Sequence, residues 1–206
     1  MNHQKTTEAR ADIYNHQDAA SELMNQMREA KLLENRTLFM SEGVGSQTAK
    51  RFVSDLLTLD ANGHDPIYFY INSPGGEVNS GFAIYDTVRF IKSPVYMITT
   101  GLCASIATII NIAVPAERRF SLPNSKFLIH QPLISGQVFG QASDIEITAT
   151  QILKTREKIN ALLAEACNQE LKKVEEDTTR DYWMSATECL EYGLIGKIIK
   201  EKSELP

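Results

Sequence analysis

Short β-rich runs alternate with longer segments of helical periodicity along most of this chain, and this alternation constrains its fold most. The runs at 67–71 (IYFYI) and 95–100 each precede a stretch of helical character, at 78–91 and 104–113. Strands that alternate with helices in this way indicate an α/β domain. With 206 residues, the chain is long enough to build one such domain around a sizeable core.

The same signals predict the remaining elements. Ser185 and Glu188 form a capping-box pattern, which marks the start of a short helix, and Gly193 is placed to end it. Ser46 is a candidate cap for an earlier helix that stops at Asn62-Gly63. The other predicted elements are helices at about 18–33 and 142–167 and strands at 36–40, 126–131 and 195–200.

The chain carries no sign of being divided into several domains. No shift in composition, internal repeat or low-complexity tract interrupts it. We therefore predict a single domain over residues 18–200, preceded by a flexible segment at 1–17 and followed by a tail at 201–206.

Charge and cysteine content exclude several classes of protein. A net charge of -5 without a basic stripe argues against nucleic-acid binding, and the Arg118-Arg119 doublet is expected to be a structural surface feature. The longest apolar stretch, 103–116, is shorter than the ~20 residues that cross a bilayer. Because the first twenty residues lack an apolar signal core, we expect a cytoplasmic protein. Three cysteines without paired spacing predict reduced thiols rather than disulfides or a metal site: Cys103, Cys167 and Cys189.

Ser105 is a candidate nucleophile because of its position in TGLCASIAT. It follows a predicted strand and stands near a predicted helix start, where backbone N–H groups and the helix dipole would favour negative charge. A serine in such a run is, however, more often a packing or capping residue. The G-x-S-x-G elbow of α/β-hydrolases is absent.

Three other segments carry groups suited to catalysis, and each has an ordinary alternative. The NSPGGE run at 72–77 could bring backbone N–H groups close to a ligand, although Pro-Gly-Gly also makes simple turns. His130, at the end of an apolar strand, is a candidate general base because histidine side chains suit that role, although it could be a core histidine. Asp181 in DTTRD is equally compatible with an ion-paired surface residue.

The order of the motifs resembles the Clp protease proteolytic subunit family. NSPGG, GLCAS, LIHQP, DTTRD and SATECLEYGLIGKI follow one another at that family's spacing, and the resemblance runs from about Leu33 to Lys200. It implies a crotonase-like α/β fold, in which β-β-α turns stack into a superhelix with a protruding, helix-containing handle. It also implies an ATP-dependent serine endopeptidase that cleaves unfolded proteins and peptides inside a chamber.

The resemblance assigns roles to the candidate residues. Ser105 is the implied nucleophile, His130 the general base and Asp181 the residue that orients the base. The N–H groups of Gly76 and Ile106 are the implied oxyanion hole. The segments after Gly76 and after His130 would pair with an extended peptide as added strands. No cofactor and no metal are implied.

The resemblance also implies an assembly. The chains would form heptameric rings stacked as a tetradecamer, in which Arg180 and Asp181 couple ring contact to the active site and 131–153 forms the handle. A AAA+ Clp ATPase would deliver unfolded polypeptides, and neither nucleic acid nor a membrane would be a partner. The implied docking pocket for a hydrophobic loop of that ATPase comprises Tyr68, Tyr70, Ile98, Phe120 and Leu122.

Several positions depart from the family pattern. The segment 11–30 matches poorly, the handle has extra residues around 134–139, and Cys103 and Ala107 replace smaller residues near Ser105. These departures suggest a divergent paralogue, weakly active or regulatory, that needs a second Clp subunit for activity. A crotonase-type acyl-CoA enzyme is the third alternative, against which the complete triad argues.

Overall fold

The structure is a computed structural model that describes residues 21–133 and 140–206. The described residues form two units, 21–37 and Leu38–Pro206, with the chain dividing between Thr37 and Leu38. The first unit contains a helix over 21–34 that leads into strand β1 (Thr37–Met40). The predicted segment 1–17 and the handle residues 134–139 lie outside the described residues.

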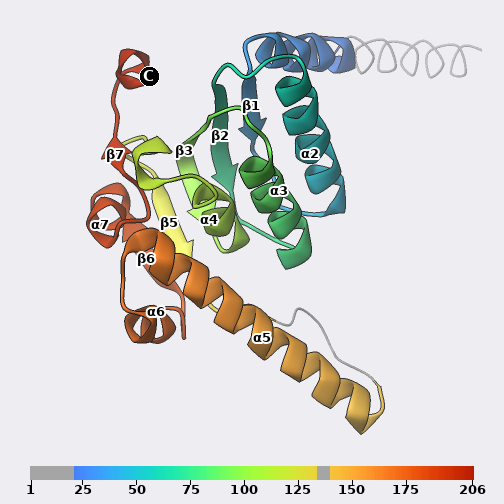
Figure 1. The fold of residues 1–206 in the computed structure, drawn as a ribbon, viewed down its shortest axis with the longest axis vertical. Coiled ribbons are helices and arrows are strands. Elements are labelled where there is room, and N and C mark those ends of the chain that lie inside the picture. Colours follow the sequence, from blue (N-terminus) through green and yellow to red (C-terminus); the bar gives the residue numbers. More distant parts are fainter. Residues whose placement is uncertain (1–20, 134–139) are drawn as a thin grey trace, which may run out of the picture. The chain divides into compact units, whose positions relative to one another are not determined.

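One mixed sheet organises the larger unit (Figure 1). Its main path is β1-β2-β3-β4-β7, while β5 joins β3 and carries β6 at its other side. The strand pairs from β2 onward are parallel, apart from the antiparallel pair β5–β6. The strands are β2 (Ile67–Ser73), β3 (Val95–Ala104), β4 (Arg119–Ser121), β5 (Lys126–Ile129), β6 (Tyr182–Ser185) and β7 (Lys197–Ile198).

Strand β3 pairs with two neighbours along one edge, and Gly101 lies between the two paired stretches. Its first half pairs with β4 through 97–99, and its second half pairs with β5 through 102–104. Gly101 adopts a φ of 86°, and the Asn72 side chain accepts a hydrogen bond from the Leu102 N–H at 3.1 Å. The sheet therefore splits at this point, and the end of β3 leads toward β5 rather than β4.

Helices cover the sheet and extend beyond it. Along β2 buried and half-buried residues alternate, and Phe69 faces Phe52 of α2 with ring centroids 4.9 Å apart. Tyr68 and Tyr70 consequently lie on the opposite face of the sheet. The helices are α2 (Ser46–Ala61), α3 (Val78–Phe90), α4 (Ile106–Asn111), α5 (Ala142–Cys167), α6 (Leu171–Asp177) and α7 (Ala186–Tyr192), with short 3₁₀ turns at Ala116–Arg118 and Lys202–Glu204.

Helix α5 projects from the domain at its N-terminal end (Figure 1). Its buried residues, which include Ile159, Leu163 and Cys167, all lie in its C-terminal half. Residues 141–150 are exposed throughout. The C-terminal half therefore anchors the helix, and the free half corresponds to the described part of the predicted handle.

The α/β class and most elements agree with the sequence predictions. The capping box is confirmed: the Ser185 Oγ accepts from the Glu188 N–H at 3.3 Å, and the Glu188 carboxylate accepts from the Ser185 N–H at 2.8 Å. Gly193 ends that helix with a φ of 90°. Ser46 is not a cap, however, because Gly45 holds the N-cap position and Ser46 lies inside α2.

The prediction of a surface role for Arg119 is wrong. Arg119 is only 4% exposed, and burial lowers the pKa of its guanidinium. The guanidinium donates to the carbonyl oxygens of Val114 at 2.7 Å and Ala166 at 2.9 Å. Arg119 thus connects the start of β4 to the end of α5 through buried hydrogen bonds.

Candidate active site

Ser105 occupies a strained turn between β3 and α4. Its φ of 56° and ψ of -128° are rare for a residue with a side chain, and such strain occurs preferentially at functional sites. The Ser105 N–H donates to the Leu128 carbonyl at 2.8 Å, which fixes the turn against β5. The hydroxyl is thereby held half-exposed at the end of the strand.

The antiparallel pair β5–β6 brings His130 and Asp181 together. Ile129, the last residue of β5, lies opposite Tyr182, the first residue of β6. His130 follows the first of these and Asp181 precedes the second, so the ladder places the two side chains beside one another. The Gln131 N–H extends this contact by donating to the Thr178 carbonyl at 2.7 Å.

The three polar side chains form one hydrogen-bonded chain. His130 Nε2 lies 2.8 Å from Ser105 Oγ, and His130 Nδ1 lies 2.9 Å from Asp181 Oδ1. The His130 side chain is 14% exposed, whereas that of Asp181 is 62% exposed. When Nδ1 carries the proton and donates a hydrogen bond to the carboxylate, Nε2 is free to accept the serine proton. The arrangement can therefore activate a hydroxyl as a nucleophile.

Gly75 belongs to the loop that follows β2 and lies directly against the serine turn. The Ser73 Oγ donates to the Glu42 carbonyl at 2.6 Å and accepts from the Gly75 N–H at 3.1 Å. Gly75 has a φ of 85°, and a Cβ there would lie 2.4 Å from the Ala104 oxygen and 2.7 Å from the Ser105 Cβ. No larger residue fits, so glycine permits the close approach of loop and nucleophile.

Gly76, in the same loop after β2, lies against the segment around Val44 that connects β1 to α2. Its φ is 152°, and a Cβ would lie 2.2 Å from the Val44 carbonyl oxygen. Val44 makes two backbone hydrogen bonds with this loop. Its N–H donates to the Gly75 carbonyl at 2.8 Å, and its carbonyl accepts from the Glu77 N–H at 2.7 Å. Within the described part of the chain, neither the Gly76 nor the Ile106 N–H donates a backbone hydrogen bond. Neither N–H is therefore occupied by a backbone acceptor in these ranges.

An apolar pocket opens beside the Ser105 hydroxyl. Its walls come from the start of α3, from α4, from the end of β5 and from α5. The pocket measures only about 20 Å³, and its lining is mostly hydrocarbon, so the chemistry of its walls suits an apolar group. The lining residues are Val78, Ser105, Ile106, Thr108, Ile109, Ile129, His130, Pro132, Ile159 and Leu163.

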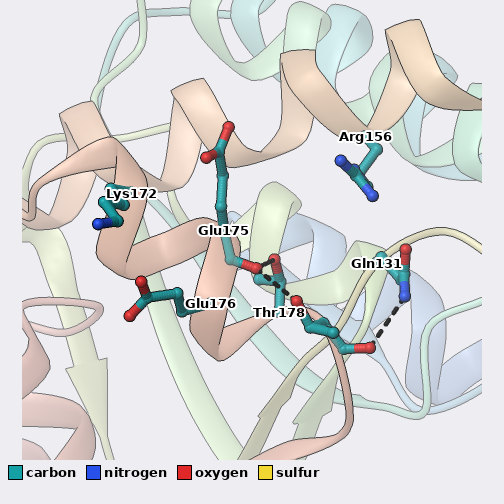
Figure 2. A pocket seen from close by; sticks show the side chains of 7 residues that line it. Gln131, Arg156, Lys172, Glu175, Glu176 and Thr178 are labelled. Carbon is teal, nitrogen blue, oxygen red and sulfur yellow. Dashed lines mark hydrogen bonds between the residues drawn. The ribbon is translucent and has the colours of Figure 1, made fainter.

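Two further pockets, both lined in part by Gln131 and Thr179, lie beside the hydrogen-bonded chain. One, of about 390 Å³, is lined by residues that include His130, Leu133, Arg180 and Asp181, so it places exposed Arg180 at the rim of the site. The other, of about 280 Å³, lies between α5 and α6. Figure 2 shows Arg156 on the side of α5 and Lys172, Glu175 and Glu176 on the side of α6. Gln131 donates its amide to the Thr179 carbonyl at 2.9 Å in this second pocket.

The predicted docking residues divide into two groups. Tyr68, Tyr70, Ile98 and Phe120 gather in one cluster, whereas Leu122 is 36% exposed and is not part of it. The sequence does not predict three further members of this cluster, one of them on β3 itself, because no local pattern shows that they meet Tyr68 and Tyr70. They are Tyr96, Ile199 and Leu205.

The three cysteines are buried and reduced. Burial raises the pKa of the Cys103 and Cys167 thiols to about 12, and it also raises the pKa of the Cys189 thiol. Cys103 therefore fills space behind the serine turn, as expected of a buried apolar residue.

The native protein should resist thiol reagents. At pH 8, a thiol with a pKa of about 12 is ionised in only about one molecule in ten thousand, and the thiolate is the reactive form. We expect no rapid reaction of the folded protein with a chromogenic disulfide reagent and release of three equivalents after denaturation. Fast labelling of Cys103 in the folded protein would contradict its placement.

The described residues show neither a metal site nor a membrane span. In 21–133 and 140–206, no group of three His, Cys, Asp or Glu side chains is arranged to hold a metal ion. No helix in the same ranges is long and apolar enough to cross a membrane.

An α/β fold that carries a Ser–His–Asp chain beside an apolar pocket has the constellation of a hydrolase, and the comparisons with known proteins specify the family. A family model described as "Clp protease" matches residues 19–202. The chain belongs to the Clp protease family, and it is accordingly a peptidase.

Individual relatives agree with this membership. "ATP-dependent Clp protease proteolytic subunit 3" of Rhizobium etli is 44% identical over 91% of this chain and 96% of its own length. "ATP-dependent Clp protease proteolytic subunit 2" of Treponema denticola is 48% identical over 85% of this chain and 88% of its own. A solved ClpP1 mutant from Listeria monocytogenes matches with a TM-score of 0.78 and 38% identity, over 84% of this chain and 96% of that one.

Proposed function

We propose that this chain is the proteolytic subunit of an ATP-dependent Clp protease and acts as a serine endopeptidase. The observation that carries the proposal is the continuous hydrogen-bonded chain from Ser105 Oγ through His130 to Asp181. Family membership and the names of the relatives support the same activity.

Ser105 is the nucleophile and His130 the general base. As the Ser105 Oγ attacks the carbonyl carbon of the scissile peptide bond, its proton moves to His130 Nε2, 2.8 Å away. The imidazolium then returns that proton to the leaving amine, and water releases the acyl group by the same route. Asp181 holds the Nδ1–H and stabilises the positive imidazolium.

The N–H groups of Gly76 and Ile106 stabilise the oxyanion. The position of a Cβ on neighbouring Gly75 lies 3.1 Å from the Ile106 nitrogen, so the glycine loop and the start of α4 are adjacent. Their donors point at charge that develops only during the reaction, and one such donor is worth roughly 2.7–4 kcal/mol. The lack of an intramolecular backbone acceptor within the described residues supports this role.

The substrate binds as an extended chain with an aliphatic side chain in the apolar pocket. The segment after Gly76 enters α3 at Val78, and its Glu77 N–H already donates to the Val44 carbonyl, so strand pairing depends mainly on the segment after His130. Main-chain pairing reads few side chains, which suits the cleavage of diverse unfolded polypeptides. The pocket restricts the residue whose carbonyl is attacked, because it is lined by Ile109, Ile159 and Leu163.

The assembly consists of heptameric rings stacked as a tetradecamer, served by a AAA+ Clp ATPase in the cytoplasm. The projecting half of α5 supports a ring-joining handle, and the cluster around Tyr68, Tyr70, Ile98 and Phe120 supports a docking surface. Relatives with the numbered names "subunit 2" and "subunit 3" favour a second candidate function, a paralogue that works with another Clp subunit. High activity of the pure protein as a homotetradecamer would exclude that dependence.

A fluorophosphonate probe tests the nucleophile directly. The wild-type protein should incorporate one probe at Ser105, and Ser105→Ala should abolish both labelling and peptide cleavage, because no other hydroxyl adjoins His130 Nε2 among the described residues. Ser54→Ala, which alters an exposed serine on α2, is the matched control and should label normally. Undiminished labelling of the Ser105→Ala protein would reject the assignment.

A further inference from the structure

The last residues of the chain fold back as a closed turn. After β7, the N–H groups of Lys200 and Glu201 donate to Glu204 Oε1 at 2.6 and 3.0 Å, and these donors lower the pKa of that carboxyl. The Leu205 N–H donates to the Lys202 carbonyl at 3.1 Å. Residues 201–206 are therefore a defined structural feature, which we call the C-terminal segment.

Leu205 of this segment packs on an aromatic surface of the sheet. The surface has a core of Ile98, Phe120 and Ile199, against which three tyrosines and Leu205 lie. Strand register explains the gathering, since Tyr68 lies opposite Tyr96, and Tyr70, Ile98 and Phe120 lie opposite one another in turn. The tyrosines are Tyr68, Tyr70 and Tyr96.

A second contact fastens the segment at its end. The Tyr68 hydroxyl donates a hydrogen bond to the Pro206 carbonyl oxygen. The Tyr68 ring itself stacks on Tyr96, with centroids 5.6 Å apart. A leucine side chain and one carbonyl group thus bind to the aromatic surface as a short peptide ligand would.

The occupied surface and the proposed docking surface are the same. Four of the five residues expected to receive the ATPase loop (Tyr68, Tyr70, Ile98 and Phe120) lie in the cluster that Leu205 contacts. A hydrophobic loop that enters this cluster must meet the same rings and the same Tyr68 hydroxyl. Both ligands cannot occupy that position together.

We propose that the C-terminal segment is an intramolecular competitor of the ATPase loop, which must displace Leu205 in order to dock. This inference rests on the proposed function, since it presupposes that a Clp ATPase binds here. The segment is suited to release because, among the described residues, only one apolar side chain and one hydrogen bond hold it to the aromatic surface, beside a solvent-accessible Lys197–Glu204 ion pair at 3.4 Å. While the segment covers the surface, the ATPase loop cannot bind. The apparent affinity for the loop is therefore its intrinsic affinity multiplied by the fraction of molecules in which the surface is open.

Charge substitution in the segment tests the competition. Leu205→Asp places a carboxylate against the aromatic surface and should release the segment, while Ser203→Asp adds the same charge at an exposed position of the same turn. The first probe is a fluorescein-labelled peptide with the sequence of residues 201–206 (EKSELP). It should bind the Leu205→Asp protein at least about tenfold more tightly than the wild type or Ser203→Asp.

The second arm uses the Clp ATPase of the same source. The ATPase concentration that gives half-maximal degradation of an unfolded protein should fall about tenfold in Leu205→Asp and stay unchanged in Ser203→Asp. If the half-maximal ATPase concentration in Leu205→Asp is unchanged, the proposal is overturned. If it rises, the proposal is overturned as well, because the segment would then be part of the docking site. Cleavage of a short peptide without ATPase, measured on all three proteins, reports the proposed peptidase activity separately.

Discussion

Replacing His130 by alanine is expected to lower kcat/KM for the hydrolysis of a short fluorogenic peptide by roughly 10⁶-fold. The imidazole is the one group that contacts both Ser105 Oγ and Asp181 Oδ1, at 2.8 and 2.9 Å. Without it, the serine proton has no acceptor and the leaving amine has no donor. The expected loss is nearly that of removing the whole triad, because the three residues act as a unit.

His64→Ala is the matched control for this substitution. His64 is also paired with a carboxylate, 3.2 Å from Asp60, but it is exposed and lies just beyond the end of α2. Its removal should leave peptide hydrolysis within about twofold of wild type, as is usual for surface positions. Circular dichroism and sedimentation should show that both variants fold and assemble alike. A His130→Ala protein that retains a tenth of the wild-type rate would contradict the role of His130.

Local sequence predicted the elements that have strong signals of their own. Helix α5 was delimited correctly at 142–167, and the capping box at Ser185 identified the start of α7. The elements that were missed bury little by themselves: α6 buries only Val174, and β6 buries only Met184. β4 begins with an arginine that is buried partly because the carbonyl groups of Ala166 and Gly193, far along the chain, accept its hydrogen bonds. Such elements are defined by tertiary contacts, which no short window records.

The candidate site shows the same division. Ser105, His130 and Asp181 were ambiguous one at a time, and their order in a resembling family selected them. No sequence pattern predicted the positive φ of Ser105, because TGLCASIAT lacks the glycine pattern of a nucleophile elbow. The pairing that sets His130 beside Asp181 depends on β6, which was not predicted. The contact of Leu205 with the aromatic cluster joins β2 to the end of the chain, beyond the reach of any local pattern.

Asp181→Asn is expected to lower kcat/KM for the same peptide by roughly 10⁴-fold. The neutral amide can donate to His130 Nδ1, which favours the tautomer with its proton on Nε2. That tautomer cannot accept the Ser105 proton, and the amide cannot stabilise the imidazolium. The 62% exposure of Asp181 does not remove this effect, because it depends on the direct 2.9 Å contact rather than on a buried charge.

Asp181 also stands next to Arg180 in the open pocket beside the triad, where the assembly is expected to act on the site. Two variants separate direct from indirect effects. Arg180→Gln leaves the His130–Asp181 hydrogen bond in place, and Asp86→Asn changes an exposed carboxylate on α3. Sedimentation should find Asp181→Asn assembled as wild type while its activity is lost, with Asp86→Asn fully active. If activity instead falls only in step with dissociation, and falls equally in Arg180→Gln, Asp181 supports the assembly and does not orient His130.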